Sequence, residues 1–405
     1  MESWKYDNDL LRMKGCMKIG IDMRCFAGGR ISGVEEYARN LIEKMISTSK
    51  EHEFILFYNA FSSKKIDFSW ATQYPHVRLV RKYFPNKLLN LSLWYFRRPF
   101  LDQMIGGVDV FFAPNLNFIA LSPRCPLIIT AHDLSFEIYP ETFSFKRRLW
   151  HLFVGPRELF SRAKKIIAVS QSTADDLMRI YGIRQEKITV IYSGISEQFT
   201  IMNRNTVDLM DIKKRYDLPY KFILFLGTFE PRKNIIALVR GYEMFRRQHT
   251  SENSDSIVQL ILVGSSGWKE EKLKKEIQKN TFYKDIRRIG FITQKDKPGL
   301  YNLATVFVYP SLYEGFGFPL AEAMKCGKPS ITSNNSSLGE IAQKGALYID
   351  PFRPEEIGLA LLELFQDKEL FSEMSQRAPL AVTRFSWRQC AKETKTVLEQ
   401  SMINH

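Results

Sequence analysis

The chain alternates between short apolar segments and longer segments in which apolar residues recur at every third or fourth position. The first apolar segment, from Met17 to Met23, is predicted to be a strand. A helix is predicted after it because apolar residues recur there at the spacing of one helix face. These residues are Val34, Tyr37, Ala38, Leu41, Ile42 and Met45. Further strands are predicted in the first half at residues 53–58, 108–112, 127–130 and 165–170. Short apolar strands separated by helices are typical of a parallel sheet covered on both faces.

The alternation restarts after residues 196–220, a polar stretch without strong periodicity that we interpret as a linker. A helix is predicted at residues 234–247, and strands at residues 222–227, 258–264, 286–292, 305–309, 330–332 and 346–349. The predicted class is therefore α/β, with two doubly wound, Rossmann-like domains. Ligands of such sheets bind beyond the carboxyl ends of the strands, so we expect a cleft where two such ends face each other.

Composition narrows the class of protein and its partners. The 405 residues are 45% hydrophobic and 25% charged, which is ordinary for globular proteins and excludes a disordered or fibrous chain. The net charge of +14 is spread over both halves, so an anionic ligand or an anionic surface is expected. No membrane-spanning segment or secretory signal is recognised, and the five cysteines are scattered. The expected location is the cytoplasm.

The most distinctive motif runs from Glu314 to Glu322 (EGFGFPLAE), shortly after the predicted strand that ends at Tyr309. Its two glycines allow the backbone to approach a ligand closely, and Pro319 suits the first turn of a helix. A helix start offers free N–H groups to an anion, while the two carboxylates can accept hydroxyl hydrogens. A nucleotide sugar presents both phosphate and hydroxyls. The pattern fits equally well an ordinary strand-to-helix turn with two solvated glutamates.

Two further loops carry candidate chemistry. Arg232 and Lys233 come just before a predicted helix, where cations are unfavourable unless an anion is bound, although a pair of solvated cations also fits. His132 and Asp133 follow a predicted strand, where they can contact a sugar, move a proton or simply cap the strand end. The loop from Gly28 to Gly33 lacks the GxGxxG spacing of a dinucleotide site.

Taken together, these segments resemble the retaining GT-B glycosyltransferases of family 4, also called group 1. The most specific element is Glu314 with Glu322, the complete E-x7-E motif of the family, preceded by the PRKN element at residues 231–234. Three weaker elements also fall where the family has them: the pair His132-Asp133, the loop Ser32-Gly33-Val34 and the segment Phe385-Ser386-Trp387. The resemblance extends from about Met17 to the end of the chain. The PRKN element is similar to that of the mannosyltransferase branch.

The resemblance implies a GT-B fold, in which two Rossmann-like domains face each other across a cleft and a C-terminal helix crosses back to the first domain. Residues 1–16 are then expected to be an N-terminal extension and residues 17–195 the acceptor-side domain. Residues 196–220 are expected to be the linker, residues 221–385 the nucleotide-sugar donor-binding domain, and residues 386–405 the returning helix.

The resemblance also implies roles for the matching residues. Arg232 and Lys233 would hold the donor diphosphate. The backbone of four residues would assist them: Gly33, Phe316, Gly317 and Phe318. Glu314 would bind hydroxyls of the donor sugar, and Glu322 the hydroxyls of the ribose.

Further roles follow from the same resemblance. Three residues would lie along the nucleotide base: Gly290, Phe291 and Ile292. His132 would lie near the transferred sugar and the acceptor. One departure concerns the first loop, where Glu35 and Glu36 replace the small and basic residues of the GIGRY sequence found in relatives. This acid pair weakens the expectation that the helix after Gly33 contacts phosphate.

Members of the family retain the anomeric configuration and need no bound metal, so no cofactor or metal site is expected. The residues implied to be catalytic are His132, Arg232, Lys233 and Glu314. In the implied front-face transfer, the departing diphosphate takes the proton of the acceptor hydroxyl. We expect a hexosyltransferase that moves mannose from GDP-mannose to a glycan or lipid-linked saccharide in cell-surface polysaccharide or glycolipid assembly. The alternatives are a UDP-sugar donor and a nucleotide-sugar-binding protein without activity; an epimerase or hydrolase fits the complete E-x7-E motif poorly.

Basic and apolar residues also mix within the first predicted domain. Residues 68–101 contain no acidic residue but six basic ones: Arg78, Arg81, Lys82, Lys87, Arg97 and Arg98. Leucines and Trp94 lie among them, and a second basic run follows at residues 146–165. This mixture suits peripheral attachment to an anionic membrane surface on the cytoplasmic side. A solvated face over an ordinary core helix is the alternative. No nucleic-acid-binding module is recognised, so no nucleic-acid partner is expected.

Overall fold

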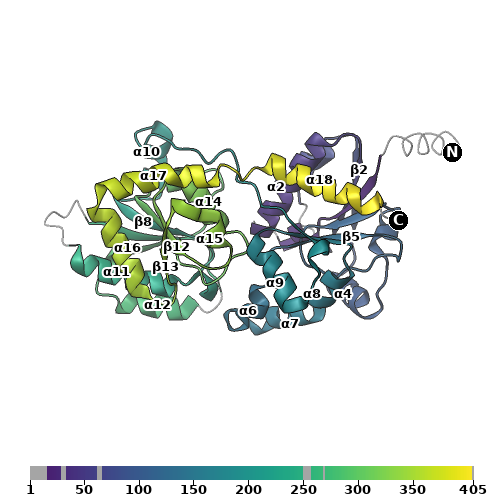
Figure 1. Ribbon diagram of the computed structural model, residues 1–405, viewed down its shortest axis with the longest axis horizontal. Coiled ribbons are helices and arrows are strands. Elements are labelled where there is room, and N and C mark those ends of the chain that lie inside the picture. Colours follow the sequence, from purple (N-terminus) through teal and green to yellow (C-terminus); the bar gives the residue numbers. More distant parts are fainter. Residues whose placement is uncertain (1–15, 29–32, 62–65, 250–256, 268–269, 404–405) are drawn as a thin grey trace. The chain divides into compact units, whose positions relative to one another are not determined.

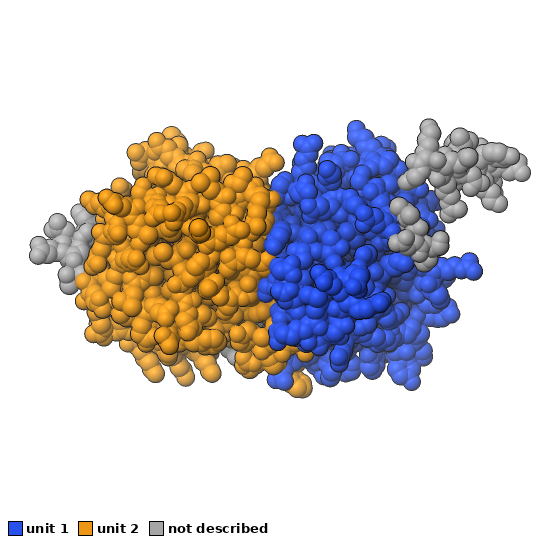
Figure 2. Space-filling view, in the orientation of Figure 1, with its two compact units in different colours: residues 1–134, 146–194, 386–405 blue, residues 135–145, 195–385 orange. Residues whose placement is uncertain are grey.

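The computed structural model describes residues 16–28, 33–61, 66–249, 257–267 and 270–403. The predicted N-terminal extension, apart from Cys16, and residues 29–32 of the first predicted loop lie outside the described residues. The chain divides into two compact units, coloured separately in Figure 2. Unit 1 comprises residues 1–134, 146–194 and 386–405, and unit 2 comprises residues 135–145 and 195–385.

Unit 1 contains a seven-stranded parallel sheet with the order β3-β2-β1-β4-β5-β6-β7 (Figure 1). Its strands are β1 (Lys18–Asp22), β2 (Glu53–Asn59), β3 (Val77–Lys82), β4 (Val110–Ala113), β5 (Leu127–Ala131), β6 (Lys165–Ala168) and β7 (Ile188–Val190). The central strands are buried on both faces, which explains their nearly uninterrupted apolar sequences. β3 and β7, which the sequence pattern did not predict, are the two edge strands and are only half-buried.

Helices cover the sheet of unit 1, and the C-terminal helix is one of them. These helices are α2 (Gly33–Thr48), α3 (Ser69–Thr72), α4 (Asn86–Tyr95), α5 (Leu101–Met104), α7 (Phe145–Val154), α8 (Pro156–Arg162), α9 (Gln171–Tyr181) and α18 (Trp387–Ile403), with 3-10 helices η1 (Arg24–Gly28) and η3 (Gln185–Lys187). α18 packs against α2. The returning C-terminal helix predicted from the family is therefore present.

Unit 2 contains a six-stranded parallel sheet with the order β10-β9-β8-β11-β12-β13. Its strands are β8 (Phe222–Leu226), β9 (Gln259–Val263), β10 (Ile286–Ile289), β11 (Val306–Tyr309), β12 (Ser330–Ser333) and β13 (Leu347–Ile349). All six coincide with predicted apolar segments. The prediction of two doubly wound, parallel α/β sheets is confirmed for both halves of the chain.

The helices of unit 2 include one inside the stretch predicted as a linker. They are α6 (Ser135–Ile138), α10 (Val207–Arg215), α11 (Ile235–Gln248), α12 (Glu270–Lys279), α13 (Lys297–Leu303), α14 (Phe318–Lys325), α15 (Ser336–Ala342), α16 (Pro354–Gln366) and α17 (Lys368–Val382), with 3-10 helices η2 (Pro140–Thr142), η4 (Pro231–Lys233), η6 (Tyr283–Asp285) and η7 (Gln343–Gly345). In α10 only Leu209 and Ile212 are buried, which is too short an apolar pattern to predict a helix. Among the described residues, none of the helices combines the length and hydropathy that a membrane crossing requires.

Candidate active site

Two loops of unit 2 converge because the strands before them are neighbours. β8 and β11 are paired in parallel, so the residues that follow them leave the sheet at the same edge. The first loop runs from Gly227 to Asn234, and the second, residues 310–317, leads into α14. The backbone N–H of Leu312 donates to the carbonyl oxygen of Arg232 at 2.8 Å. The two most specific sequence elements therefore lie side by side.

Gly264 allows the first loop to pack tightly on its other side. Its φ is +148°, and a Cβ atom at this position would lie 1.9 Å from the carbonyl oxygen of Gly227. Only glycine permits both this backbone conformation and this approach. One residue further along, the carbonyl oxygen of Ser265 accepts a hydrogen bond from the backbone N–H of Phe229 at 3.0 Å. The loop that carries Arg232 and Lys233 is thus attached to the segments following both neighbouring strands.

Arg232, Lys233 and Glu314 form a buried charge cluster. Arg232 Nη1 donates to Glu314 Oε2 at 2.9 Å, and Lys233 Nζ donates to Glu314 Oε1 at 2.5 Å. Arg232 Nη2 also donates to Glu230 Oε1 at 2.9 Å. Lys233 is 8% exposed and Glu314 is 6% exposed. Glu314 therefore contacts two residues that precede it in the sequence by 82 and 81 positions.

The cluster keeps the Glu314 carboxylate ionised. Burial alone would raise the pKa of Glu314, but the charges of Arg232 and Lys233 outweigh it and lower the pKa to about 2. For Lys233, burial and the charge of Arg232 lower the pKa, while Glu314 opposes them. At neutral pH Glu314 has no proton to donate. It can therefore accept hydrogen bonds from hydroxyls but cannot serve as a general acid.

This arrangement predicts a steep loss of stability in acid. The pKa of Glu314 falls from an ordinary value of 4.5 to about 2 on folding, so its stabilisation is present above pH 4.5 and is lost as the pH falls toward 2. Between pH 5 and pH 3 this one group accounts for a loss of about 2 kcal/mol in the free energy of unfolding. Urea denaturation at several pH values measures it. In Glu314→Gln, the free energy of unfolding should fall by about 2 kcal/mol less between pH 5 and pH 3 than in the wild type. An equal fall in both proteins would contradict the assignment.

Two more members of the cluster, Tyr309 and Ser311, did not stand out in the sequence. Lys233 Nζ donates to the Tyr309 hydroxyl at 2.7 Å, and Ser311 Oγ donates to Glu314 Oε1 at 2.5 Å. Burial, reinforced by Glu314, raises the pKa of Tyr309 well above its usual range, so it stays a neutral phenol. The available signal was position, because both residues lie at the carboxyl end of a predicted strand.

Glu322 lies in a second buried network, on α14. Its Oε1 accepts from Lys297 Nζ at 2.7 Å, and its Oε2 accepts from the Tyr301 hydroxyl at 2.7 Å. Glu322 is 1% exposed and Lys297 is 8% exposed. Lys297 and Tyr301 lie one turn apart on α13, and neither belongs to a motif that is recognisable in the sequence. Each carboxylate oxygen has two lone pairs and can accept more than one hydrogen bond. Binding of the ribose by Glu322 stays a prediction.

Gly317 fixes the backbone at the start of α14. It has a φ of +89°, and a Cβ atom here would lie 2.8 Å from Leu338 Cδ2, so other residues would be both strained and crowded. On either side of it, the rings of Phe316 and Phe318 pack with their centroids 5.0 Å apart. Phe316 is buried and also packs edge-on against Phe385 at 5.3 Å. The three residues predicted to contact phosphate through their backbone are thus held rigidly beside Glu314.

The three residues predicted to lie along the base follow β10, at the same edge of the sheet. Phe291 is 69% exposed, Ile292 is buried, and the space beside the α-carbon of Gly290 is open. An exposed aromatic ring next to an open glycine can accept a flat base. Contact with a base stays a prediction.

His132 lies in unit 1, at the carboxyl end of β5. Its Nε2 lies 2.8 Å from the carbonyl oxygen of Pro114, so Nε2 carries the proton and Nδ1 is the acceptor. The ring packs edge-on against Tyr37, with centroids 4.8 Å apart. Burial lowers the pKa of His132 despite the contact with Pro114, so the imidazole is neutral at pH 7. Gly33 is the first residue of α2, after the undescribed residues 29–32.

Unit 1 also contains a group of potential metal ligands at Glu51, His52 and Glu399, whose donor atoms lie within 4.8 Å of one another. Lys395 Nζ donates to Glu51 at 2.6 Å, and His52 Nε2 lies 3.1 Å from Glu399 Oε1. These contacts already pair both carboxylates. The group therefore functions as an ion-pair network that holds α18 against the start of β2.

Comparison with known families covers most of the chain. Residues 31–199 match the family "Glycosyltransferase Family 4", and residues 209–380 match the family "Glycosyl transferases group 1". O-antigen chain mannosyltransferase B of Escherichia coli is 31% identical over 379 residues, covering 90% of this chain and 95% of that protein.

Solved structures show the same fold along nearly the entire chain. Sucrose-phosphate synthase from Thermosynechococcus elongatus matches with a TM-score of 0.73 and 19% identity, covering 96% of this chain and 100% of that one. Anabaena HepE in complex with UDP-glucose matches with a TM-score of 0.69 and 21% identity, covering 95% and 100%. These likenesses confirm the predicted GT-B fold class. Because a relative more than 30% identical matches over almost its full length, the chain belongs to the group 1, or family 4, glycosyltransferases.

Proposed function

We propose that this glycosyltransferase is a retaining mannosyltransferase that moves mannose from GDP-mannose to a glycan or lipid-linked saccharide in cell-surface polysaccharide assembly. The observation that carries the donor site is the buried cluster of Arg232, Lys233 and Glu314 at the carboxyl edge of the second sheet. The choice of mannose, and of an O-antigen type of acceptor, is supported by the name of the E. coli relative.

The two cations are placed to stabilise a departing diphosphate. Lys233 Nζ and the Arg232 guanidinium both end at the Glu314 carboxylate, so their donors converge on one point. Negative charge grows on the phosphate oxygen as the bond from C1 of the sugar breaks. Preorganised cations in a buried site stabilise that charge more strongly than solvated cations would. We therefore assign them the leaving group.

The remaining polar groups position the reactants. Glu314 is ionised, and in the proposed reaction it accepts hydrogen bonds from hydroxyls of the donor sugar, as Glu322 does from the ribose. His132, protonated at Nε2, presents Nδ1 as an acceptor for a hydroxyl of the transferred sugar or the acceptor. At neutral pH Glu314 is ionised and His132 is a neutral imidazole, so neither serves as a general acid. The proton of the acceptor hydroxyl is therefore proposed to pass to the departing diphosphate.

This proton transfer defines the stereochemistry. The new bond forms between the acceptor oxygen and C1, the bond from C1 to the phosphate oxygen breaks, and the proton moves to that phosphate oxygen. Both oxygens must lie on the same face of the sugar for the transfer, so the anomeric configuration is retained. Arg232 and Lys233 supply the positive charge, and no bound metal is required in this scheme.

The donor is tested by thermal unfolding of the full chain with GDP, UDP, ADP and their sugars, first with EDTA and then with Mg²⁺. A ligand at about 100 times its dissociation constant stabilises the folded state by about 2.7 kcal/mol. We expect GDP and GDP-mannose to raise the midpoint most, to the same extent with and without Mg²⁺. A larger effect of UDP-sugars would replace the donor assignment. A shift only with Mg²⁺ would contradict the metal-free scheme, and no shift would contradict the donor site.

A UDP-sugar is the second candidate donor. Its support is the structural likeness to Anabaena HepE, which binds UDP-glucose. The base-contacting segment at Gly290, Phe291 and Ile292 offers one aromatic ring and backbone groups, which suit either base. A nucleotide-sugar-binding protein without activity is disfavoured by the family membership and by the intact charge cluster.

A further inference from the structure

Unit 1 contains a cavity of about 460 Å³ whose lining includes none of the residues assigned to the reaction. It opens at the amino ends of β5, β6 and β7, since Leu127 starts β5 and Lys164 and Lys187 directly precede β6 and β7. His132 follows the opposite end of β5, and five residues of strand span about 16 Å. The cavity is therefore at the other edge of the sheet from the predicted acceptor side.

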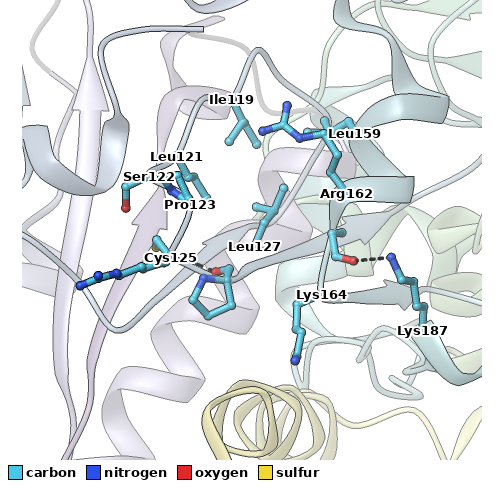
Figure 3. A pocket seen from close by; sticks show the side chains of 13 residues that line it. Ile119, Leu121, Ser122, Pro123, Cys125, Leu127, Leu159, Arg162, Lys164 and Lys187 are labelled. Atoms are coloured by element: carbon cyan, nitrogen blue, oxygen red, sulfur yellow. Dashed lines mark hydrogen bonds between the residues drawn. The ribbon is translucent and has the colours of Figure 1, made fainter. Parts of the chain in front are cut away.

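The cavity is lined by cations and by no acid. Its charged residues are Arg124, Arg162, Lys164 and Lys187. Figure 3 shows it between the segment of Ser122 and Cys125 on one side and the side chains of Arg162, Lys164 and Lys187 on the other. Lys187 Nζ is held by the carbonyl oxygen of Ser161 at 2.6 Å, at the end of α8. Within the described part of the chain, neither Arg124 nor Lys164 forms an ion pair. Arg162 lies 3.9 Å from Glu158 of the adjoining groove, so the cavity has more positive than negative charge and attracts an anion.

An apolar groove continues from this cavity, sharing Ile119, Leu159 and Arg162 with it. Trp94 of α4 and Phe153 of α7 meet in the groove, with ring centroids 5.0 Å apart. Its one acid, Glu158, accepts from Arg97 Nη2 at 2.8 Å. The groove and the cavity together thus contain five cations and one paired acid.

The helices α4 and α7, which contribute to the groove, also have several large apolar side chains that are exposed. α7 has no buried residue, and its apolar side chains include Leu152, which is 73% exposed, and Phe153, which is 40% exposed. On α4, Leu88 is 63% exposed and Leu91 is 52% exposed. α7 also carries Lys146, Arg147 and Arg148 in exposed positions. Several exposed apolar side chains on neighbouring helices that also carry cations suggest an interaction surface, and this mixture fits the headgroups and acyl chains of an anionic membrane.

We propose that the cationic cavity and the exposed faces of α4 and α7 form a docking surface for an anionic phospholipid membrane, in which Arg124 and Lys164 bind lipid phosphate while Leu91 and Leu152 insert among the acyl chains. Nucleic acid fits less well, because leucine side chains gain nothing from a phosphate backbone. The inference does not depend on which donor is used. Docking in this way brings the enzyme to the membrane that carries a lipid-linked acceptor and leaves the His132 edge of the sheet open.

The test is flotation of the full-length protein with vesicles of phosphatidylcholine and phosphatidylglycerol in roughly equal parts, and with phosphatidylcholine alone. We expect binding to the anionic vesicles only, weakened by salt. Removing a cation at an anionic surface costs about fivefold in affinity, so Arg124→Gln and Lys164→Gln should each weaken binding by that factor. Leu91→Ser with Leu152→Ser should weaken it further at high salt. Lys233→Ala should bind like the wild type, which separates this proposal from the donor site.

Matched controls come from exposed residues of unit 2. Lys272→Gln and Lys275→Gln each remove one positive charge, as Arg124→Gln and Lys164→Gln do, and the double variant Phe352→Ser with Leu380→Ser removes two exposed apolar side chains. All three control variants should bind like the wild type. Equal losses in the controls, equal binding to phosphatidylcholine alone, or no vesicle binding would each overturn the proposal. Binding of soluble glycerol phosphate in the cavity without any vesicle binding would also overturn it. The same holds if the protein binds unrelated DNA, and this binding depends on the same cations but not on the two leucines.

Discussion

Lys233→Met is expected to lower kcat about 100- to 1,000-fold while changing the KM for the donor much less. Methionine keeps the length of the side chain but removes the charge that we propose stabilises the departing diphosphate. That charge matters most when the bond from C1 to the phosphate breaks, so its loss falls on the transition state. Steady-state kinetics with GDP-mannose and a saccharide acceptor separate the two constants. The variant should fold, because Glu314 keeps its contacts with Arg232 and Ser311.

Two further variants make this result specific. Lys279→Met removes an exposed lysine from the same unit and should leave both constants unchanged. Lys233→Arg keeps the charge in a different shape and should recover part of the lost turnover. If Lys233→Met instead raises KM at constant kcat, Lys233 only binds the ground state. If the variant Lys233→Met loses its activity because it is largely unfolded under the assay conditions, Lys233 has a structural role. The leaving-group assignment would then be withdrawn.

The architecture was predictable from the sequence because parallel sheets bury both faces of their strands. Strands such as β8 and β11 are therefore uninterrupted apolar segments that need no tertiary information to recognise. The two edge strands of unit 1 lack this uninterrupted apolar pattern. β3 carries Arg78 and Arg81 among its apolar residues because it is an edge strand that is only half-buried, and β7 has three half-buried residues. The helix α10 was missed for a similar reason, since two buried residues are too few to establish a period.

The candidate site was predictable only where its residues belong to motifs. Arg232, Lys233 and Glu314 could be named from the sequence, and the pairing of β8 with β11 explains why they meet. Their partners could not be named, because Tyr309 has the sequence environment of an ordinary strand end. The sequence also left open whether Glu314 would be solvated. The structure places it in a buried contact with two cations, which keeps it ionised at neutral pH and able to accept hydrogen bonds from hydroxyls.

Lys297→Met is expected to destabilise the protein by about 3–5 kcal/mol, seen as a lower urea midpoint of the full chain. Lys297 Nζ is the cation paired with Glu322 Oε1, and both side chains are buried. Removing the lysine leaves the buried Glu322 carboxylate without its cation, and an uncompensated buried charge is costly. Replacing the network as a whole avoids this cost. The triple variant Lys297→Met, Tyr301→Phe and Glu322→Leu should therefore have a midpoint close to that of the wild type.

This triple variant also separates the two roles of Glu322. If the carboxylate binds the ribose as well as Lys297, the triple variant is stable but binds GDP about ten- to a hundredfold more weakly, because a hydrogen bond to a charged group is lost. Titration of the stable triple variant with GDP measures this directly. The variant Tyr301→Phe, which keeps the carboxylate and its lysine, should bind GDP like the wild type. Unchanged GDP binding in the triple variant would show that Glu322 only supports the packing of α14 on α13, and the second glutamate of the motif would lose its assigned contact with the donor.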